Sequence, residues 1–286
     1  MAKEIIFNNY YVCGQTDTGL MREHNEDNIL INTSMGLLLV ADGIGGHDAG
    51  EVASLEAIQL IDKLFQQYLL PHQNNSNTLK PTVWQKLRTL LGFHPAENTV
   101  SIAEYQQIAE DILIETNKHV FQLNQERKVS EGTGMGTTIV GVLLIAATQQ
   151  LLVFHIGDSR LYRFTKQHKL EQITKDHSVL QVWIDNGAIG TPPNSNIILQ
   201  AIGPYPSIQP SVQLIDINAE QDACFLLCSD GLSDMLDEQM LTASLAELES
   251  DSLEDVVQRL VDTANNQGGK DNISAIILQT ASKTRS

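Results

Sequence analysis

The sequence predicts an α+β fold built in layers, with its strands in runs and its helices gathered in pairs. Short apolar runs bounded by turn residues, such as NILINT and GLLLVAD, are typical of strands. Longer stretches carry apolar residues at three- and four-residue steps, which indicates amphipathic helices. With 286 residues and 42% hydrophobic side chains, the chain is long enough to bury a large core.

In the first half, one helix is expected from about Glu51 to Leu70 and a second from Ile102 to about Gln125. Between them, at 71–97, lie a loop rich in Asn and Pro and a short amphipathic stretch. We interpret this stretch as an insertion in a surface connection, where extra length costs little stability. A helix packed on the body is favoured over a docking element.

The second half begins with four strand-like segments, TTIVGVLLIA, QLLVFHIGD, SRLYRF and LEQIT. A surface segment rich in Gly, Pro and Asn follows at about 184–205. The chain closes with a strand at Ala223–Cys228, helices near Ser233–Leu248 and Leu253–Asn266, and the strand ISAIILQT. Neither an internal repeat nor a linker between domains is evident.

The charge balance limits the partners. The chain carries 35 acidic and 18 basic residues, a formal net charge of −17. Phosphate backbones and anionic membranes are held by clustered Lys and Arg, so we expect neither partner. No apolar run approaches the about 18 residues of a membrane span, and no signal peptide is evident, so no membrane insertion and a cytoplasmic location are expected.

The negative charge is unevenly distributed. Between Asp216 and Asp262 there are 13 acids and one base. We interpret this excess as a solvated acidic face on the C-terminal helices; the alternative is a surface that recruits a basic segment or repels acidic proteins.

The three cysteines are Cys13, Cys224 and Cys228. Their odd number and their spacing argue against a disulfide framework or a zinc site. Cys224 and Cys228 would share one face of a strand, and we expect all three to be buried thiols.

Four aspartates at predicted strand ends form the most informative pattern: Asp42, Asp158, Asp230 and Asp271. In three cases a glycine adjoins the aspartate. A single Asp-Gly pair is usually a tight turn, but four such carboxylates, with a further acidic pair in REHNED, are hard to attribute to turns alone. Converging carboxylates repel each other unless cations lie between them. Oxygen ligands without cysteine favour Mg²⁺ or Mn²⁺, so the residues predict a di-metal hydrolase site that activates water against a phosphoryl group.

Seven segments, in order from about Val12 to Ile277, resemble the metal-dependent Ser/Thr protein phosphatases (type 2C, or PPM, family) in their bacterial form. They are MREHNEDN, VADGIGGHDAGEVAS, GMGTT, HIGDSRLYR, ITKDHS, LLCSDGLSDML and GGKDNIS. The resemblance implies a single domain over residues 1–286, with its core at about 8–280 and a flap at about 184–205. It also implies an α+β fold in which a central two-sheet antiparallel β-sandwich is flanked by pairs of α-helices, in four layers (αββα).

The resemblance implies a metal-binding role for each matching acid. Asp42 would bridge two Mn²⁺ or Mg²⁺ ions, and the carbonyl of Gly43 would complete the shell of the second. Asp230 and Asp271 would bind the first ion. The pair Glu26 and Asp27 would act directly or through metal-bound waters, with Asp27 favoured as the one facing the site.

Asp158 and Asp234, with Asp230, match a third, weaker metal site of bacterial members. For Asp158 the alternative is a structural role in its turn, with Arg160 as its partner. For Asp234 the alternative is an ordinary helix acid favoured by the macrodipole.

Two further residues match positions around the substrate. Arg22 matches the arginine that contacts substrate phosphate, and its fork of donors suits phosphate oxygens. His47 is a candidate general acid for the leaving alkoxide. Family relatives from animals place a histidine directly after the Asp-Gly, so the alternative is that His47 is only a structural neighbour. Thr137, Thr138, Asp176 and His177 are interpreted as structural supports.

The implied activity is hydrolysis of phosphoserine and phosphothreonine in proteins by direct attack of a metal-bridging hydroxide, opposing a Ser/Thr kinase in bacterial signalling. The expected partners are phosphorylated proteins and a cognate Ser/Thr kinase, and the protein is expected to be a monomer. Two alternatives stay open: a pseudo-phosphatase that binds partners without turnover, and a hydrolase of small phosphoesters. A degenerate member should lack a core aspartate, whereas all three are present here.

Overall fold

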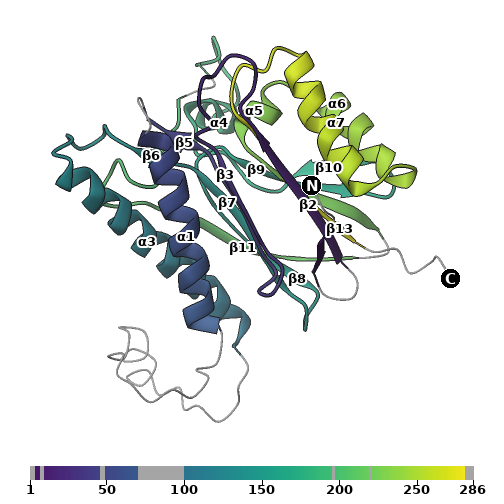
Figure 1. Ribbon diagram of the computed structural model, residues 1–286, viewed down its shortest axis with the longest axis horizontal. Helices are drawn as coiled ribbons and strands as arrows, with labels where there is room; N and C mark the ends of the chain where they lie inside the picture. Colours follow the sequence, from purple (N-terminus) through teal and green to yellow (C-terminus); the bar gives the residue numbers. More distant parts are fainter. Residues whose placement is uncertain are drawn as a thin grey trace.

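Two antiparallel sheets lie face to face, and a pair of long helices covers the outer face of each (Figure 1). This arrangement confirms the expected four-layer αββα sandwich. The expected insertion at 71–97 lies outside the described residues. The computed structural model describes residues 4–6, 10–45, 49–69, 100–194, 197–218 and 221–280.

The first sheet has the strand order β1-β2-β13-β12-β9-β10. β2 and β13 pair from Asp17 opposite Ile273 to Tyr10 opposite Thr280, so strands from the two ends of the chain lie side by side. The bounds are β1 Glu4–Ile6, β2 Tyr10–Asp17, β9 Arg160–Thr165, β10 Leu170–Gln172, β12 Asp222–Cys228 and β13 Ile273–Thr280.

The second sheet has the order β11-β8-β7-β4-β3, and a separate two-stranded ribbon pairs β5 with β6. The ribbon has only two residues in each strand, with Gly43 opposite Thr137 and Ile44 opposite Gly136. The bounds are β3 Asn28–Asn32, β4 Leu37–Ala41, β5 Gly43–Ile44, β6 Gly136–Thr137, β7 Ile139–Ile145, β8 Gln150–Ile156 and β11 Ser211–Asp216.

The helices α1 (Ala49–Leu69) and α3 (Ile102–Glu126) cover the five-stranded sheet, and α6 (Glu238–Ala246) and α7 (Leu253–Asn266) cover the other (Figure 1). The side chain of Ser101 caps α3 in a reciprocal capping box with Glu104, which fixes where this helix starts. None of the helices among the described residues has an apolar stretch long enough to cross a bilayer.

Three apolar clusters fill the spaces between the four layers. One packs α1 and α3 on the five-stranded sheet, one lies between the sheets, and one packs α6 and α7 on the six-stranded sheet. β4 shows how the alternation of strand side chains serves two of them: Leu37 and Leu39 face the helices, whereas Leu38 and Val40 face the other sheet. A strand buried on both faces reads as a continuous apolar run, which is why this strand was predictable.

Several elements differ from the sequence prediction. The helix expected at Ser233–Leu248 is divided into α5 (Asp230–Ser233), α6 and the 3₁₀ turn η1 (Glu247–Glu249). The segment expected at 184–205 begins inside a short helix, α4 (Val179–Asp185), that the sequence analysis did not anticipate. α4 has only seven residues, so its apolar side chains do not repeat over the length by which a helix is recognised.

The three cysteines are free and buried, as expected, and all belong to the core under α6 and α7. Burial raises the pKa of Cys228 to about 12 and raises that of Cys224 as well. Their role is therefore packing, since a thiol that does not ionise is a poor nucleophile and a poor metal ligand.

Gly141 of β7 tests how tightly the helix-facing core is packed. A Cβ at this position would lie 2.3 Å from Cε2 of Phe154 and 2.6 Å from Cδ2 of Leu39, both of which are completely buried. We expect Gly141→Ala to lower the free energy of unfolding by about 1–3 kcal/mol through overpacking. Urea unfolding followed by circular dichroism measures this, and an unchanged stability would show that the Phe154 ring can move aside.

Candidate metal centre

The four strand-end aspartates lie at the ends of strands from both sheets. Asp42 follows β4 and Asp158 follows β8, both in the five-stranded sheet, whereas Asp230 follows β12 and Asp271 precedes β13 in the other sheet. The charges of Asp27, Asp230 and Asp158 all act on Asp42. The structure thus brings these predicted site residues together at one end of the sandwich.

Asp42 and Asp230 form the most strongly coupled pair. Burial raises the pKa of Asp42 well above its ordinary value, and the negative charges of Asp27 and Asp230 raise it further. The two side chains hydrogen-bond to each other, which requires a proton on one of them. Burial also raises the pKa of Asp230 to about 6. Because the two carboxyls titrate together, the raised pKa values describe the pair rather than either residue alone.

Asp27 is the most deeply buried acid of the N-terminal pair, with 4% of its surface exposed. Its Oδ2 accepts a hydrogen bond from Oγ of Ser229 at 2.7 Å, whereas its Oδ1 is buried without a hydrogen-bond partner. Burial raises the pKa of Asp27 to about 7, against the lowering effect of Ser274 and Ser229. This carboxyl therefore keeps one oxygen free for a further ligand.

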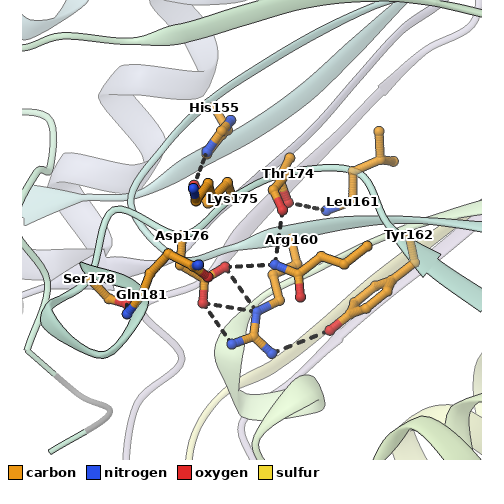
Figure 2. A network of polar contacts seen from close by, with 10 residues as sticks. His155, Arg160, Leu161, Tyr162, Thr174, Lys175, Asp176, Ser178 and Gln181 are labelled. Carbon is orange, nitrogen blue, oxygen red and sulfur yellow. Dashed lines mark hydrogen bonds and ion pairs between the residues drawn. The ribbon is translucent and has the colours of Figure 1, made fainter. Parts of the chain in front are cut away.

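Asp158 shares these properties: its Oδ1 is buried without a partner, and burial followed by the charge of Asp230 raises its pKa to about 7. Arg160 does not hydrogen-bond to it. Figure 2 shows the guanidinium turned to Asp176, with Nη2 2.7 Å from Oδ2 and Nε 3.1 Å from both carboxylate oxygens. The alternative in which Arg160 is the partner of Asp158 is therefore wrong, and Asp176 has the structural role expected of it.

His177 also has the structural role expected of it. Its ring stacks on that of His155 with 4.6 Å between the centroids, and its Nδ1 accepts a hydrogen bond from the backbone N–H of Gly157 at 3.2 Å. Burial, followed by the neighbouring ring of His155, lowers the pKa of His177 to about 4, so this ring stays neutral near pH 7. It supports the turn that carries Asp158.

These carboxyls fit divalent cations. Within the described ranges, no three Asp, Glu, His or Cys side chains form a ready-made metal cage. The fit rests instead on the unpartnered oxygens of Asp27 and Asp158 and on the proton that Asp42 and Asp230 share. A divalent cation satisfies such oxygens and replaces such a proton, and an all-oxygen donor set suits Mg²⁺ and Mn²⁺.

Arg22 and Asp271 form an ion pair at the rim, with Nη2 2.6 Å from Oδ2 and exposed side-chain fractions of 51% and 37%. The other oxygen of Asp271 accepts from the backbone N–H of Asn272 at 2.8 Å. The structure thus places the predicted phosphate-binding arginine beside a predicted metal ligand, with its guanidinium open to solvent.

Glu26 and Gly43 are neighbours at the start of α1. A Cβ on Gly50 would lie 2.5 Å from Oε2 of Glu26, and a Cβ on Gly43 would lie 2.5 Å from the backbone oxygen of Glu26. Only glycines at these two positions allow the backbone to lie so close to Glu26. The carboxylate of Glu26 therefore lies against the first turn of α1, where the helix dipole stabilises negative charge.

The remaining two site predictions have different outcomes. The exposed Asp234 ends α5, and partial desolvation raises the pKa of its carboxyl. Because Asp234 is the C-cap of this helix, where the macrodipole disfavours a carboxylate, the alternative of a helix acid favoured by the macrodipole is wrong, and the metal-binding role stays a prediction. His47 lies outside the described residues, so its role as general acid stays a prediction.

Neutral side chains support the acids, and the sequence analysis missed most of them. Asn272 accepts from the backbone N–H of Glu26 and donates to the carbonyls of Thr18 and His24, which ties this loop to β13. Ser229 both donates to Asp27 and accepts from the backbone N–H of Ser274. In the sequence, Asn272 directly follows Asp271 and Ser229 directly precedes Asp230. That adjacency could have identified both as supports of the predicted ligands.

The supports of Asp42 were expected. Thr137 donates its hydroxyl to the carbonyl of Asp42 at 2.8 Å, and Oγ1 of Thr138 accepts from the backbone N–H of Asp42 at 3.2 Å. Oγ1 of Thr138 is also 2.6 Å from Oγ of Ser159. Both threonines thus fix the backbone of the central aspartate, as the sequence analysis proposed.

The sequence profile of the family described as Protein phosphatase 2C matches residues 21–276. The chain belongs to this family. Among curated relatives, the Listeria monocytogenes "Serine/threonine phosphatase stp" is 29% identical over 273 residues, which cover 93% of this chain and 94% of the relative. The Mycobacterium tuberculosis "Serine/threonine protein phosphatase PstP" is 29% identical over 92% of this chain and 43% of its own length.

Solved structures of this phosphatase family have the same fold. The Staphylococcus aureus Stp1 structure superposes with a TM-score of 0.75 at 27% identity and covers 95% of both chains. The catalytic domain of PstP, in complex with two manganese ions, superposes with a TM-score of 0.70 at 27% identity and covers 96% of this chain and 99% of its own. The Mn²⁺ or Mg²⁺ dependence expected for this phosphatase is thereby confirmed.

The raised pKa values make the stability of the metal-free protein depend on pH. Asp27 and Asp158 have a pKa of about 7 in the fold against 3.8 ordinarily, so between these values the folded state binds more protons than the unfolded chain. Stability should therefore fall as the pH rises toward 7, because these carboxyls must ionise in a buried site. Mn²⁺ should offset the loss, because it binds the ionised form.

Thermal unfolding in EDTA and in Mn²⁺, between about pH 5 and 8, measures this effect. Asp158→Asn is the matched control, because it removes one titrating carboxyl and should make the slope in EDTA shallower. Equal slopes for the wild type and the variant would contradict the assignment.

Proposed function

We propose that this centre hydrolyses phosphoserine and phosphothreonine in proteins, with two Mn²⁺ or Mg²⁺ ions held by Asp42, Asp230, Asp271, the acidic pair Glu26 and Asp27, and the carbonyl of Gly43. Membership of the protein phosphatase 2C family supports this activity. The observation that carries the assignment of the site is the buried cluster of acids around Asp42, whose pKa is raised by burial and by its acidic neighbours. Ionisable groups whose pKa is shifted both by burial and by specific charged neighbours are typical of functional sites.

Bound divalent cations would supply an activated water and would neutralise charge that develops on the phosphoryl oxygens. The protein holds the acids and their backbone in place with neutral side chains, namely Ser229 and Thr137 as donors and Thr138 and Asn272 as acceptors, so that little positive charge competes with the cations. Asp158 and Asp234, with Asp230, are proposed as ligands of a third, weaker site.

Arg22 is proposed to receive the phosphate of the substrate. Its guanidinium is half exposed and pairs with Asp271, a proposed metal ligand, so a phosphate bound beside the metals would lie near it. A planar fork of donors matches two phosphate oxygens at once. His47 is retained as the proposed general acid for the departing side-chain oxygen.

The wider biological setting is also a proposal. A cognate Ser/Thr kinase would supply the phosphorylated proteins, and the protein would act as a monomer in one domain over residues 1–286, with residues 184–205 as a flap. The three free cysteines fit a reducing compartment, which supports a cytoplasmic location.

We expect Asp42→Ala to reduce Mn²⁺-dependent hydrolysis of a phosphothreonine peptide by roughly a thousandfold or more, since it removes the proposed bridge between the two ions. Initial rates of phosphate release measure this. An Asp42→Ala variant that retains turnover would contradict the assignment of the metal site. A wild-type protein without turnover would favour the pseudo-phosphatase. Higher kcat/KM on aryl phosphate than on phosphopeptides would favour the hydrolase of small phosphoesters.

We expect Arg22→Lys to raise KM for a phosphothreonine peptide about tenfold while leaving kcat nearly unchanged. Lysine keeps the charge but loses the bidentate geometry, and a charge-assisted hydrogen bond contributes about 1.5–3 kcal/mol. Steady-state kinetics measure the split. Arg259→Lys is the matched control, because Arg259 lies on α7 and pairs with Asp251. Equal KM values for the two variants would show that Arg22 does not bind the phosphate of the substrate.

A further inference from the structure

Two asparagines of α3 hold the peptide groups of Gly203 from both sides. Oδ1 of Asn117 accepts from the N–H of Gly203 at 2.8 Å, and Nδ2 of Asn124 donates to the C=O of Gly203 at 3.0 Å. Only 1% of Asn117 and 3% of Asn124 is exposed. We call these three residues the glycine clamp. None of them belongs to the candidate metal centre.

The glycine clamp is fully hydrogen-bonded and tightly packed. Nδ2 of Asn117 also donates to the carbonyl of Tyr205, and Asn124 exchanges two hydrogen bonds with the backbone of Met135. Gly203 has φ +108°, and a Cβ there would lie 2.6 Å from Cγ1 of Val120 on α3. Buried amides that satisfy every partner fix one arrangement of the chain, because leaving any partner unpaired is costly.

A continuous row of hydrogen bonds joins this clamp to the metal centre. Ile202, which precedes Gly203, exchanges backbone hydrogen bonds of 3.0 and 2.9 Å with Thr137 of β6. Thr137 in turn pairs with Gly43 of β5 and donates its hydroxyl to the carbonyl of Asp42. The β5–β6 ribbon therefore has Asp42 and Gly43 on one side and Ile202 on the other.

The ribbon needs such support. α1 contacts both strands, but strands of two residues each share only one short line of backbone pairing, and a third strand adds to it. Ile202 supplies the third line of backbone pairing, and α3 fixes Ile202 through Gly203. We propose that Asn117 and Asn124 are positioning residues for the metal centre: they hold the ribbon that places Asp42 and Gly43. This inference rests on the proposed metal-binding role of these two residues.

If the clamp favours metal binding, metal binding must favour the clamp by the same factor, because coupling free energies are reciprocal. The wild-type chain can therefore test the proposal without any substitution. Amide hydrogen exchange at Ile202 and Gly203 should slow severalfold when Mn²⁺ is added, because local opening of the clamp becomes rarer. Exchange rates that Mn²⁺ leaves unchanged would overturn the proposal.

The second measurement is the Mn²⁺ dissociation constant of the full chain by titration calorimetry. Asn117→Leu should weaken Mn²⁺ binding about threefold to tenfold, somewhat less than the roughly 10–100-fold typical of residues that touch a metal ligand directly. Asn117→Asp, which keeps the acceptor for the N–H of Gly203, should restore part of this affinity. Thr116→Val is the matched control, because this buried hydroxyl donates only to Ile112 within α3.

Each outcome of the Mn²⁺ titrations either supports or overturns the proposed role of the glycine clamp. Weaker binding by Asn117→Leu with unchanged binding by Thr116→Val supports the clamp, because a merely structural loss would lower the unfolding midpoint in both without altering affinity. Unchanged affinity in Asn117→Leu overturns the clamp alone and leaves the proposed function intact. Failure of the wild type to bind Mn²⁺ overturns the proposed function and the clamp with it.

Discussion

Repulsion among buried carboxylates is the constraint on which the rest of the structure depends. Asp27, Asp42 and Asp230 are kept close together at the end of the sandwich, where burial and the charges of neighbouring carboxylates raise the pKa of each. A flexible chain would relieve this repulsion by moving the acids apart. The three apolar clusters prevent that movement, because each strand that leads into an aspartate is packed on both faces.

The polar surroundings of the acids determine how the repulsion can be relieved. Neutral hydroxyls and amides, such as Ser229 and Thr138, bind the acids or their backbone, and the nearby Arg160 is engaged by Asp176. Arg22 pairs with Asp271 only at the exposed rim. The charge of Arg160 lowers the pKa of Asp158 and Asp230, but burial outweighs it and both pKa values stay raised. Protons or divalent cations must therefore neutralise the centre, and a site of this kind selects hard cations.

The sequence could predict those features whose pattern lies within a short stretch of the chain, but not those that depend on contacts between distant segments. α7 was predicted with its bounds, since its apolar face repeats along the helix, and the aspartates were predicted because each adjoins an apolar strand. β2 carries half-buried polar residues in its second half, and the seven residues of α4 are too few for a repeat to show. The partner of Arg160 could not be inferred, since Asp158 is only two residues away in sequence, whereas Asp176 is 16 residues away and is brought beside Arg160 by the loop after β10.

The two sheets contribute equally to the centre, and this links metal binding to the integrity of the fold. Asp42 and Asp158 leave one sheet, whereas Asp230 and Asp271 adjoin strands of the other. Without neutralisation, repulsion at this end pushes the sheets apart, while the cluster between them holds them together. Cations shared between Asp42 and the acids of the other sheet would reverse that force and join the sheets at the same point. The aspartates proposed to bind the metal ions are thus also the residues whose mutual repulsion destabilises the fold. Occupancy of the metal site and stability should therefore change together.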